Sequence, residues 1–277
     1  MIMNVGQKKF NLAEKTLIMG IVNVTPDSFS DGGRYNELDR AVEHARKLAA
    51  DGADILDIGG ESTRPGHEKV SEEEELERVI PVIEAISSQV DVPISIDTYK
   101  AEVARQAIAA GADIINDVWG AKADPNMAKV MADAEVPVIL MHNRENMDYS
   151  DILTDMMADL NESIGLVKKA GVKDSNIILD PGIGFAKTFE HNLLVMRRLD
   201  ELKVLGYPLL LGTSRKRFIG TVLDLPTDER VEGTGATTCL GIQKGCSIVR
   251  VHDVKENARM AKMMDAMLGK PFSSHGS

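Results

Sequence analysis

The sequence predicts an α/β fold in which eight short parallel strands alternate with helices and close into a single barrel. Eight apolar runs lack polar alternation, as expected of strands that are covered on both faces. Segments with apolar residues at helical spacing lie between the runs, so successive strands are connected through helices. The length of 277 residues suits one such barrel domain over residues 1–277, with an open doubly wound sheet as the alternative.

The strands can be assigned in chain order. Residues 1–14 precede the first strand and are interpreted as a short N-terminal hairpin or cap. The tail, residues 273–277, is expected to be disordered. The strands themselves are expected at residues 16–23, 54–58, 93–97, 113–117, 136–141, 178–180, 207–212 and 247–252.

The helices follow from periodic apolar residues and from start and stop signals. Ser71 with Glu74 predicts a capping box at the start of the second helix. Gly52, Gly111 and Gly171 end three of the others. The remaining helices are expected at residues 38–49, 101–110, 127–134, 153–167, 189–202, 229–244 and 254–268.

The net charge and the cysteine content narrow the class of protein. A formal net charge of -11 argues against a nucleic-acid partner, which requires a basic surface, but allows a small phosphorylated ligand at a local cluster of cations. The two cysteines, Cys239 and Cys246, form no disulfide framework and have no zinc-site spacing. Without a signal-peptide pattern or an apolar run that could span a bilayer, the chain is expected to be a cytoplasmic enzyme.

Residues 178–187 indicate where the functional site lies. An apolar strand ends there in Asp180, and Pro181 and two glycines follow, which allow a ligand to approach the backbone closely. Polar side chains recur at other strand ends, and the carboxyl ends of the strands form the site of a barrel enzyme. Because a buried polar group is costly unless it is paired, this recurrence predicts function. The residues are Asn23, Asp97, Asn116, Asp180, Lys216, Arg250 and His252.

These polar groups fall into two chemical classes. Asp97 and Asp180, with Asn116 between them in strand order, offer acceptors and an amide to a flat heterocycle with a guanidine-like edge. Lys216 is suited to a carbonyl or ring nitrogen of the same ligand. The second class, donors for an anion, consists of Arg64, Arg250 and His252. Residues 24–33 and 59–66 are polar and rich in turn formers, so we interpret both as functional loops.

The segments that carry these groups resemble the dihydropteroate synthases. MGIVNVTPDSFSDGG at 19–33 and DIGGESTRPG at 57–66 match two signatures of that family, and the match continues at 180–185, 214–216 and 250–252. The resemblance covers nearly the whole chain and implies a (β/α)8 TIM barrel of folate biosynthesis, a target of sulfonamides. Such an enzyme joins 6-hydroxymethyl-7,8-dihydropterin pyrophosphate to p-aminobenzoate, giving 7,8-dihydropteroate and pyrophosphate.

The resemblance also implies roles for single residues and a Mg²⁺ cofactor. The pterin pocket, which carries the catalytic groups, is expected to contain Asp97, Asn116, Asp180 and Lys216. The pyrophosphate and Mg²⁺ side would contain Asn23, Arg64, Arg250 and His252, with Asp31 near the metal. The p-aminobenzoate pocket would contain Phe29, Thr63, Pro65 and Phe185. Arg217 stands where many members of the family have serine, which leaves the role of its side chain open.

The charges predict a dissociative reaction. The carbon between pterin and pyrophosphate can become a cation that the electron-rich ring stabilises, so the leaving group departs before the amine attacks. The protein then stabilises the cation with Asp97 and Asp180 and holds pyrophosphate with Mg²⁺ and cationic side chains. Two alternatives are a methyltransferase that binds methyltetrahydrofolate in a related barrel, which needs no TPDSF loop, and a non-catalytic pterin-binding module, which would be expected to lose Lys216 or Arg64.

We expect small-molecule substrates, no membrane and a homodimer. The last predicted helix carries four methionines, which we interpret as core that faces the barrel, with packing against a second subunit as the alternative. They are Met260, Met263, Met264 and Met267.

Overall fold

The computed structural model confirms the barrel and describes residues 1–24, 33–61 and 69–272, without the side chains of 33–37. The eight parallel strands form one sheet in the order β8-β7-β6-β5-β4-β3-β10-β9. A parallel bridge between Leu179 and Leu209 joins the two outer strands, so the sheet closes on itself and the open-sheet alternative is wrong. The strands are β3 (Leu17–Asn23), β4 (Ile55–Gly59), β5 (Ile94–Asp97), β6 (Ile114–Asp117), β7 (Val138–Met141), β8 (Ile177–Asp180), β9 (Leu210–Gly212) and β10 (Ile248–Val251).

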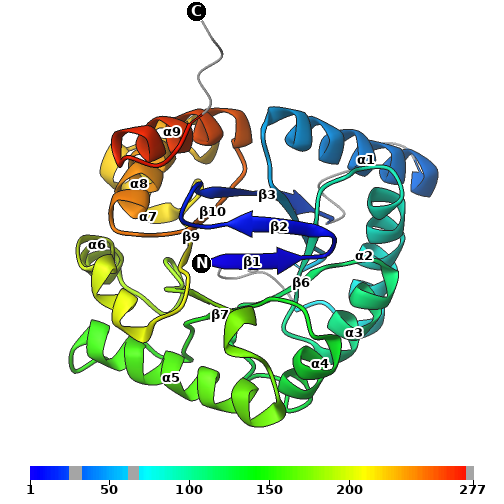
Figure 1. Ribbon diagram of the computed structural model, residues 1–277, viewed down its shortest axis with the longest axis horizontal. Helices are drawn as coiled ribbons and strands as arrows, with labels where there is room; N and C mark the ends of the chain where they lie inside the picture. The colour runs from blue at the N-terminus through cyan, green and yellow to red at the C-terminus, as the bar shows by residue number, and fades with distance from the viewer. Residues whose placement is uncertain (25–32, 62–68, 273–277) are drawn as a thin grey trace, which may run out of the picture.

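The helices form a ring around this barrel (Figure 1). Buried aliphatic side chains fill the layer between the strands and the helices and make up the larger of the two apolar clusters. Among the described residues, no helix is long and apolar enough to cross a membrane. The helices are α1 (Gly33–Asp51), α2 (Glu72–Ser87), α3 (Ala101–Ala110), α4 (Met127–Ala134), α5 (Ile152–Ala170), α6 (Phe189–Arg197), α7 (Arg217–Leu223), α8 (Val231–Gln243) and α9 (Val254–Met267).

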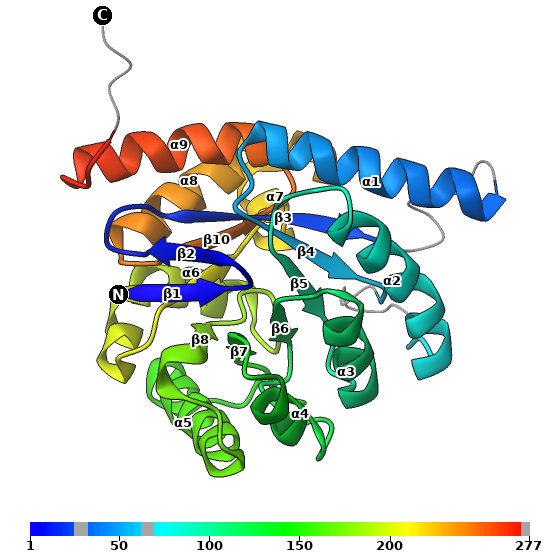
Figure 2. The same cartoon turned by 45° about the vertical axis from the view of Figure 1, so that its right-hand side comes forward.

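The predicted N-terminal hairpin is confirmed and closes one end of the barrel. Its two antiparallel strands are β1 (Ile2–Val5) and β2 (Lys8–Asn11), and the turn lies at Gly6, which has a φ of 56°. Buried side chains of the hairpin, Met3 and Val5, pack against residues near the amino ends of the barrel strands, such as Leu17 and Ile55. Figure 2 shows the hairpin from another side. The opposite end, where the strands terminate, remains for a ligand.

Two predictions about helix ends need correction. The helix expected over 189–202 ends at Arg197, and a 3₁₀ helix (Leu199–Leu205) follows, because a three-residue repeat places both Leu199 and Leu202 in the core. Ser71 caps α2 by accepting a hydrogen bond from the Glu74 backbone N–H (3.1 Å), but the Glu74 carboxylate contacts Arg78 instead of completing a capping box.

The methionines of α9 are not all core. Met264 is partly buried against the large apolar cluster, and Met260 is half-buried. Met263 and Met267 are 58% and 62% exposed, so the interpretation as barrel-facing core is wrong for these two.

Candidate functional site

The strand ends bring the predicted polar residues together at one rim of the barrel. The register places Asp97 beside Gly59 on one side and beside Asn116 on the other. On the far side of the rim, Asp180 ends β8, and Arg250 lies in β10 beside Gly212 of β9. Asp97, Asn116 and Asp180 are all buried. Their positions agree with a ligand site at the carboxyl ends of the strands.

The guanidinium of Arg250 connects two carboxylates across the barrel interior. Its Nε donates to Asp57 Oδ2 (2.5 Å) and its Nη2 donates to Asp97 Oδ2 (2.7 Å). Asn116 Nδ2 approaches the same Asp57 carboxylate, 3.3 Å from Oδ2 and 3.4 Å from Oδ1. The sequence predicts that Arg250 binds an anion, and in this structure its guanidinium contacts the carboxylates of Asp57 and Asp97.

Asp57 is the site residue that sequence reasoning missed. It is fully buried inside β4, and both its partners belong to the predicted site. The available signal was a carboxylate within the apolar run Ile55–Gly59, because a charge in a covered strand requires a partner. Its partners reside on other strands, far away in sequence.

Asp97 keeps one carboxylate oxygen for another partner. While Oδ2 accepts from Arg250, Oδ1 is buried and has no hydrogen-bond partner among the described residues. Burial raises the pKa of Asp97 to about 7, with Arg250 acting in the opposite direction and the nearby Asp57 adding to the rise. A buried acceptor without a donor is costly in a free protein. It fits a ligand that brings an N–H group to this position.

Asp180 and Lys216 face the segment between β8 and α6. Asp180 Oδ1 accepts from the Gly182 backbone N–H (2.7 Å), and the Lys216 ammonium donates to the carbonyl oxygen of Ile183. The same ammonium lies 4.9 Å from the ring centre of Phe185. Burial raises the pKa of Asp180 and lowers the pKa of Lys216 to about 8, and the two charges partly offset these shifts.

Two glycines allow this segment to pass close to its neighbours. Gly182 has a φ of +66°, and a Cβ there would lie 2.0 Å from the carbonyl oxygen of His142. Gly184 has a φ of +88°, and its Cβ would lie 3.1 Å from Lys216 Cδ. Both conformations favour glycine, and the backbone here lies close to its neighbours in the protein; the close approach to a ligand stays a prediction.

The predicted anion side is only partly described. His252 Nδ1 lies 2.8 Å from Ser214 Oγ, which also accepts from the His252 backbone N–H (3.0 Å), so the ring orientation is fixed. Asn23 is exposed at the end of β3. Five residues that the sequence predicts for the site lie outside the described residues: Phe29, Asp31, Thr63, Arg64 and Pro65.

Comparisons with known proteins agree with this geometry. Residues 19–252 match the family model described as pterin binding enzyme. The dihydropteroate synthase of Bacillus subtilis (strain 168) is 66% identical over 263 residues, covering 95% of this chain and 92% of that protein.

Two solved structures have the same fold. A dihydropteroate synthase from Clostridium difficile, determined in the presence of pteroic acid, has a TM-score of 0.92 at 53% identity and covers 95% of this chain and 100% of that one. The Xanthomonas albilineans dihydropteroate synthase with 4-aminobenzoic acid has a TM-score of 0.92 at 42% identity, covering 98% and 99%.

Proposed function

This chain belongs to the dihydropteroate synthases, pterin-binding transferases of folate biosynthesis, and we propose that it joins 6-hydroxymethyl-7,8-dihydropterin pyrophosphate to p-aminobenzoate. The observation that carries the residue assignment is the buried, unpaired oxygen of Asp97 beside Asn116, with Asp180 across the same rim. Acceptors at the carboxyl ends of two strands suit the N–H groups of a pterin's guanidine-like edge.

The two carboxylates also suit the charge that develops during the reaction. As the carbon–oxygen bond to pyrophosphate breaks, positive charge appears on the pterin methylene and ring. Asp97 and Asp180 stabilise that charge in a buried environment, where electrostatic interactions are stronger than in water. Lys216, whose ammonium donates to Ile183 in this structure, supplies a donor to the ring. The amine of p-aminobenzoate then attacks the methylene and loses a proton.

The pyrophosphate is assigned to the opposite side of the mouth. His252, oriented by Ser214, supplies a donor there. Arg250 holds Asp57 and Asp97 with its Nε and Nη2, and we assign its Nη1 to the pyrophosphate as a second donor. Arg64 is assigned to the same anion from the sequence. We assign Phe185, beside Lys216, to the p-aminobenzoate end, together with Phe29, Thr63 and Pro65.

The oxygen ligands proposed for the pyrophosphate side of the mouth suit Mg²⁺. Mg²⁺ retains several waters and takes one or two protein oxygens together with phosphate oxygens, so it needs no cluster of carboxylates. Asn23 offers an exposed carboxamide at the end of β3, and Asp31 is the proposed second ligand. When bound, the ion would neutralise charge on the departing pyrophosphate.

The exposed methionines Met263 and Met267 of α9 support a homodimer as a further part of the proposal. Light scattering on the purified protein measures its mass: a dimer mass is expected, and a monomer mass at every concentration contradicts it.

The activity is tested by a turnover assay. Incubation with the pterin pyrophosphate, p-aminobenzoate and Mg²⁺ should yield pyrophosphate and 7,8-dihydropteroate in equal amounts, with Asp180→Asn strongly reduced. Binding of the pterin without release of pyrophosphate would instead indicate a non-catalytic module, and transfer of a methyl group from methyltetrahydrofolate would indicate a methyltransferase.

A further inference from the structure

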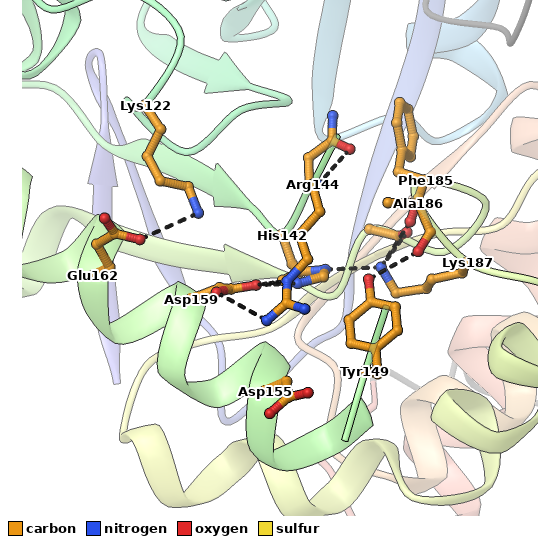
Figure 3. Close-up of polar contacts among 12 residues, drawn as sticks. Lys122, His142, Arg144, Tyr149, Asp155, Asp159, Glu162, Phe185, Ala186 and Lys187 are labelled. Carbon is orange, nitrogen blue, oxygen red and sulfur yellow. Dashed lines mark hydrogen bonds and ion pairs between the residues drawn. The ribbon is translucent and has the colours of Figure 1, made fainter. Parts of the chain in front are cut away.

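Lys187 is a buried lysine that the proposed chemistry does not use. It lies between β8 and α6 and is 8% exposed. Its ammonium has three acceptors: the carbonyl oxygens of Gly182 and Phe185, each at 3.0 Å, and His142 Nδ1 at 2.9 Å (Figure 3). An ammonium carries three N–H donors, so each of them has a partner. The Lys187 ammonium therefore binds two carbonyl groups of the short segment between Gly182 and Ala186.

His142 and Asp159 fix the acceptor that faces this ammonium. Because His142 Nδ1 accepts from Lys187, its proton resides on Nε2, which donates to Asp159 Oδ2 at 2.9 Å. Burial and the charge of Lys187 lower the pKa of His142 to about 3, so the ring stays neutral. Arg144 holds the carboxylate of Asp159 from the other side, with its Nε 2.5 Å from Oδ2.

Tyr149 holds the same segment at its far end. Its hydroxyl donates to the carbonyl oxygen of Ala186 (2.8 Å), and the Arg144 guanidinium lies 4.6 Å from the centre of its ring (Figure 3). Arg144 therefore contacts both Asp159 and Tyr149. The segment between Gly182 and Ala186 is thus supported by side chains from the end of β7, from α5 and from their connection.

Two residues of the proposed pterin site contact the same segment from the barrel mouth. Asp180 accepts from the Gly182 N–H, and Lys216 donates to the Ile183 carbonyl. We propose that Lys187 is a positioning residue for the pterin site, which holds this segment so that Asp180 and Lys216 face the ligand in a fixed arrangement. The inference rests on the proposed function, since it takes these two side chains as pterin-binding groups.

Removal of the Lys187 ammonium should therefore weaken pterin binding, although Lys187 is not assigned a contact with the pterin. Lys187→Met keeps the aliphatic chain but leaves the Gly182 and Phe185 carbonyls without their donor. Small misplacements of binding groups cost up to roughly 100-fold, so affinity for 6-hydroxymethyl-7,8-dihydropterin should fall about 10- to 100-fold. Lys173→Met is the matched control, because that lysine pairs with Glu135 on the surface. Lys173→Met should leave the pterin affinity unchanged.

Two substitutions of His142 distinguish the contribution of its Nδ1 hydrogen bond from that of its Nε2 hydrogen bond. Asparagine retains an acceptor near the position of Nδ1, toward Lys187, whereas glutamine retains a donor near Nε2, toward Asp159. If the ammonium is what positions the segment, His142→Gln weakens pterin binding more than His142→Asn. The reverse order would show that the Asp159 contact alone matters.

The pH dependence gives a readout that loss of folding would not produce. Burial lowers the pKa of Lys187 to about 7, and a neutral amine has two N–H groups for three acceptors. The advantage of the native protein over Lys187→Met should therefore shrink as the pH rises from about 6 to about 9. Lys216 titrates in both proteins, and its charge is one of the causes that lower the pKa of Lys187. The groups that face Lys187 are His142, Arg144, Asp159, Asp180 and Lys216.

Calorimetry and hydrogen exchange together decide the question. In the free protein, amides 182–186 should exchange faster in Lys187→Met than in the native chain, while α5 remains protected. Unchanged exchange, pterin affinity within twofold of native, or an affinity ratio independent of pH would overturn the inference. If the native protein itself fails to bind pterin, the proposed function falls and this role with it, so the two failures are distinguishable.

Discussion

Replacement of Asp97 by asparagine should lower pterin affinity and raise the stability of the free protein. The binding loss follows from the unpaired oxygen, which is available to accept an N–H from the ligand. A hydrogen bond to a charged group contributes about 1.5–3 kcal/mol, and an amide in the wrong orientation opposes one donor with another. The expected loss is therefore roughly 2–4 kcal/mol, or about 30- to 1,000-fold in affinity.

The stability gain follows from the pKa of the same carboxyl. Burial raises it from 3.8 to about 7, so the folded protein binds this proton more tightly than the unfolded chain. Stability then falls as the pH rises from about 4 to about 7, and above pH 7 the full cost of the buried charge is present. Asparagine avoids that cost, so Asp97→Asn should be more stable at pH 8 by up to about 4 kcal/mol, with the difference vanishing near pH 4.

Two measurements check this pair of effects. Calorimetric titration with 6-hydroxymethyl-7,8-dihydropterin gives the affinity, and urea denaturation at pH 8 and at pH 4 gives the free energy of unfolding. Asp133→Asn is the control, because that carboxylate lies on the surface of α4 and pairs with Lys129. An Asp97→Asn protein with native pterin affinity, or one less stable than native at pH 8, refutes the reasoning.

Three other perturbations test separate parts of the account. Arg250→Ala should weaken binding of the pyrophosphorylated pterin more than that of the hydroxymethyl pterin, and equal losses in paired titrations would place this guanidinium on the ring alone. Gly182→Ala should lower the free energy of unfolding by roughly 2–4 kcal/mol in urea, since its Cβ would meet the His142 carbonyl oxygen; Gly165→Ala, with open space in α5, should not destabilise. Chelation of divalent ions should stop turnover but leave hydroxymethyl pterin binding intact, and turnover in excess chelator would contradict a role for Mg²⁺.

The barrel and much of its rim were predictable because they depend on local patterns. Apolar runs without alternating polar residues identified the strands. Because the strands are parallel, their carboxyl ends, with Asp97, Asn116 and Asp180, lie at the same end of the barrel. Arg250 was identified as a strand-end cation, but its actual partners are set by which side chains face the barrel interior together.

What the sequence did not reveal depends on contacts between distant segments. In the sequence, Asp57 is a charged residue within an apolar strand. Its role becomes clear only from its contact with Arg250, which is 193 residues away in the chain. Lys187 looks like an ordinary charged residue before a helix. Its burial results from the path of the chain at Gly182, where a positive φ turns carbonyl groups toward the ammonium.

The central claim, that carboxylates of β5 and β8 bind the pterin while the other side of the mouth binds pyrophosphate, is tested most directly by a crystal structure with the pterin pyrophosphate and Mg²⁺. The account predicts the guanidine-like edge of the pterin within about 3 Å of Asp97 and Asp180, with phosphate oxygens and the ion near Asn23 and His252. A pterin ring lying away from both carboxylates, or a phosphate group beside Asp180, would contradict it.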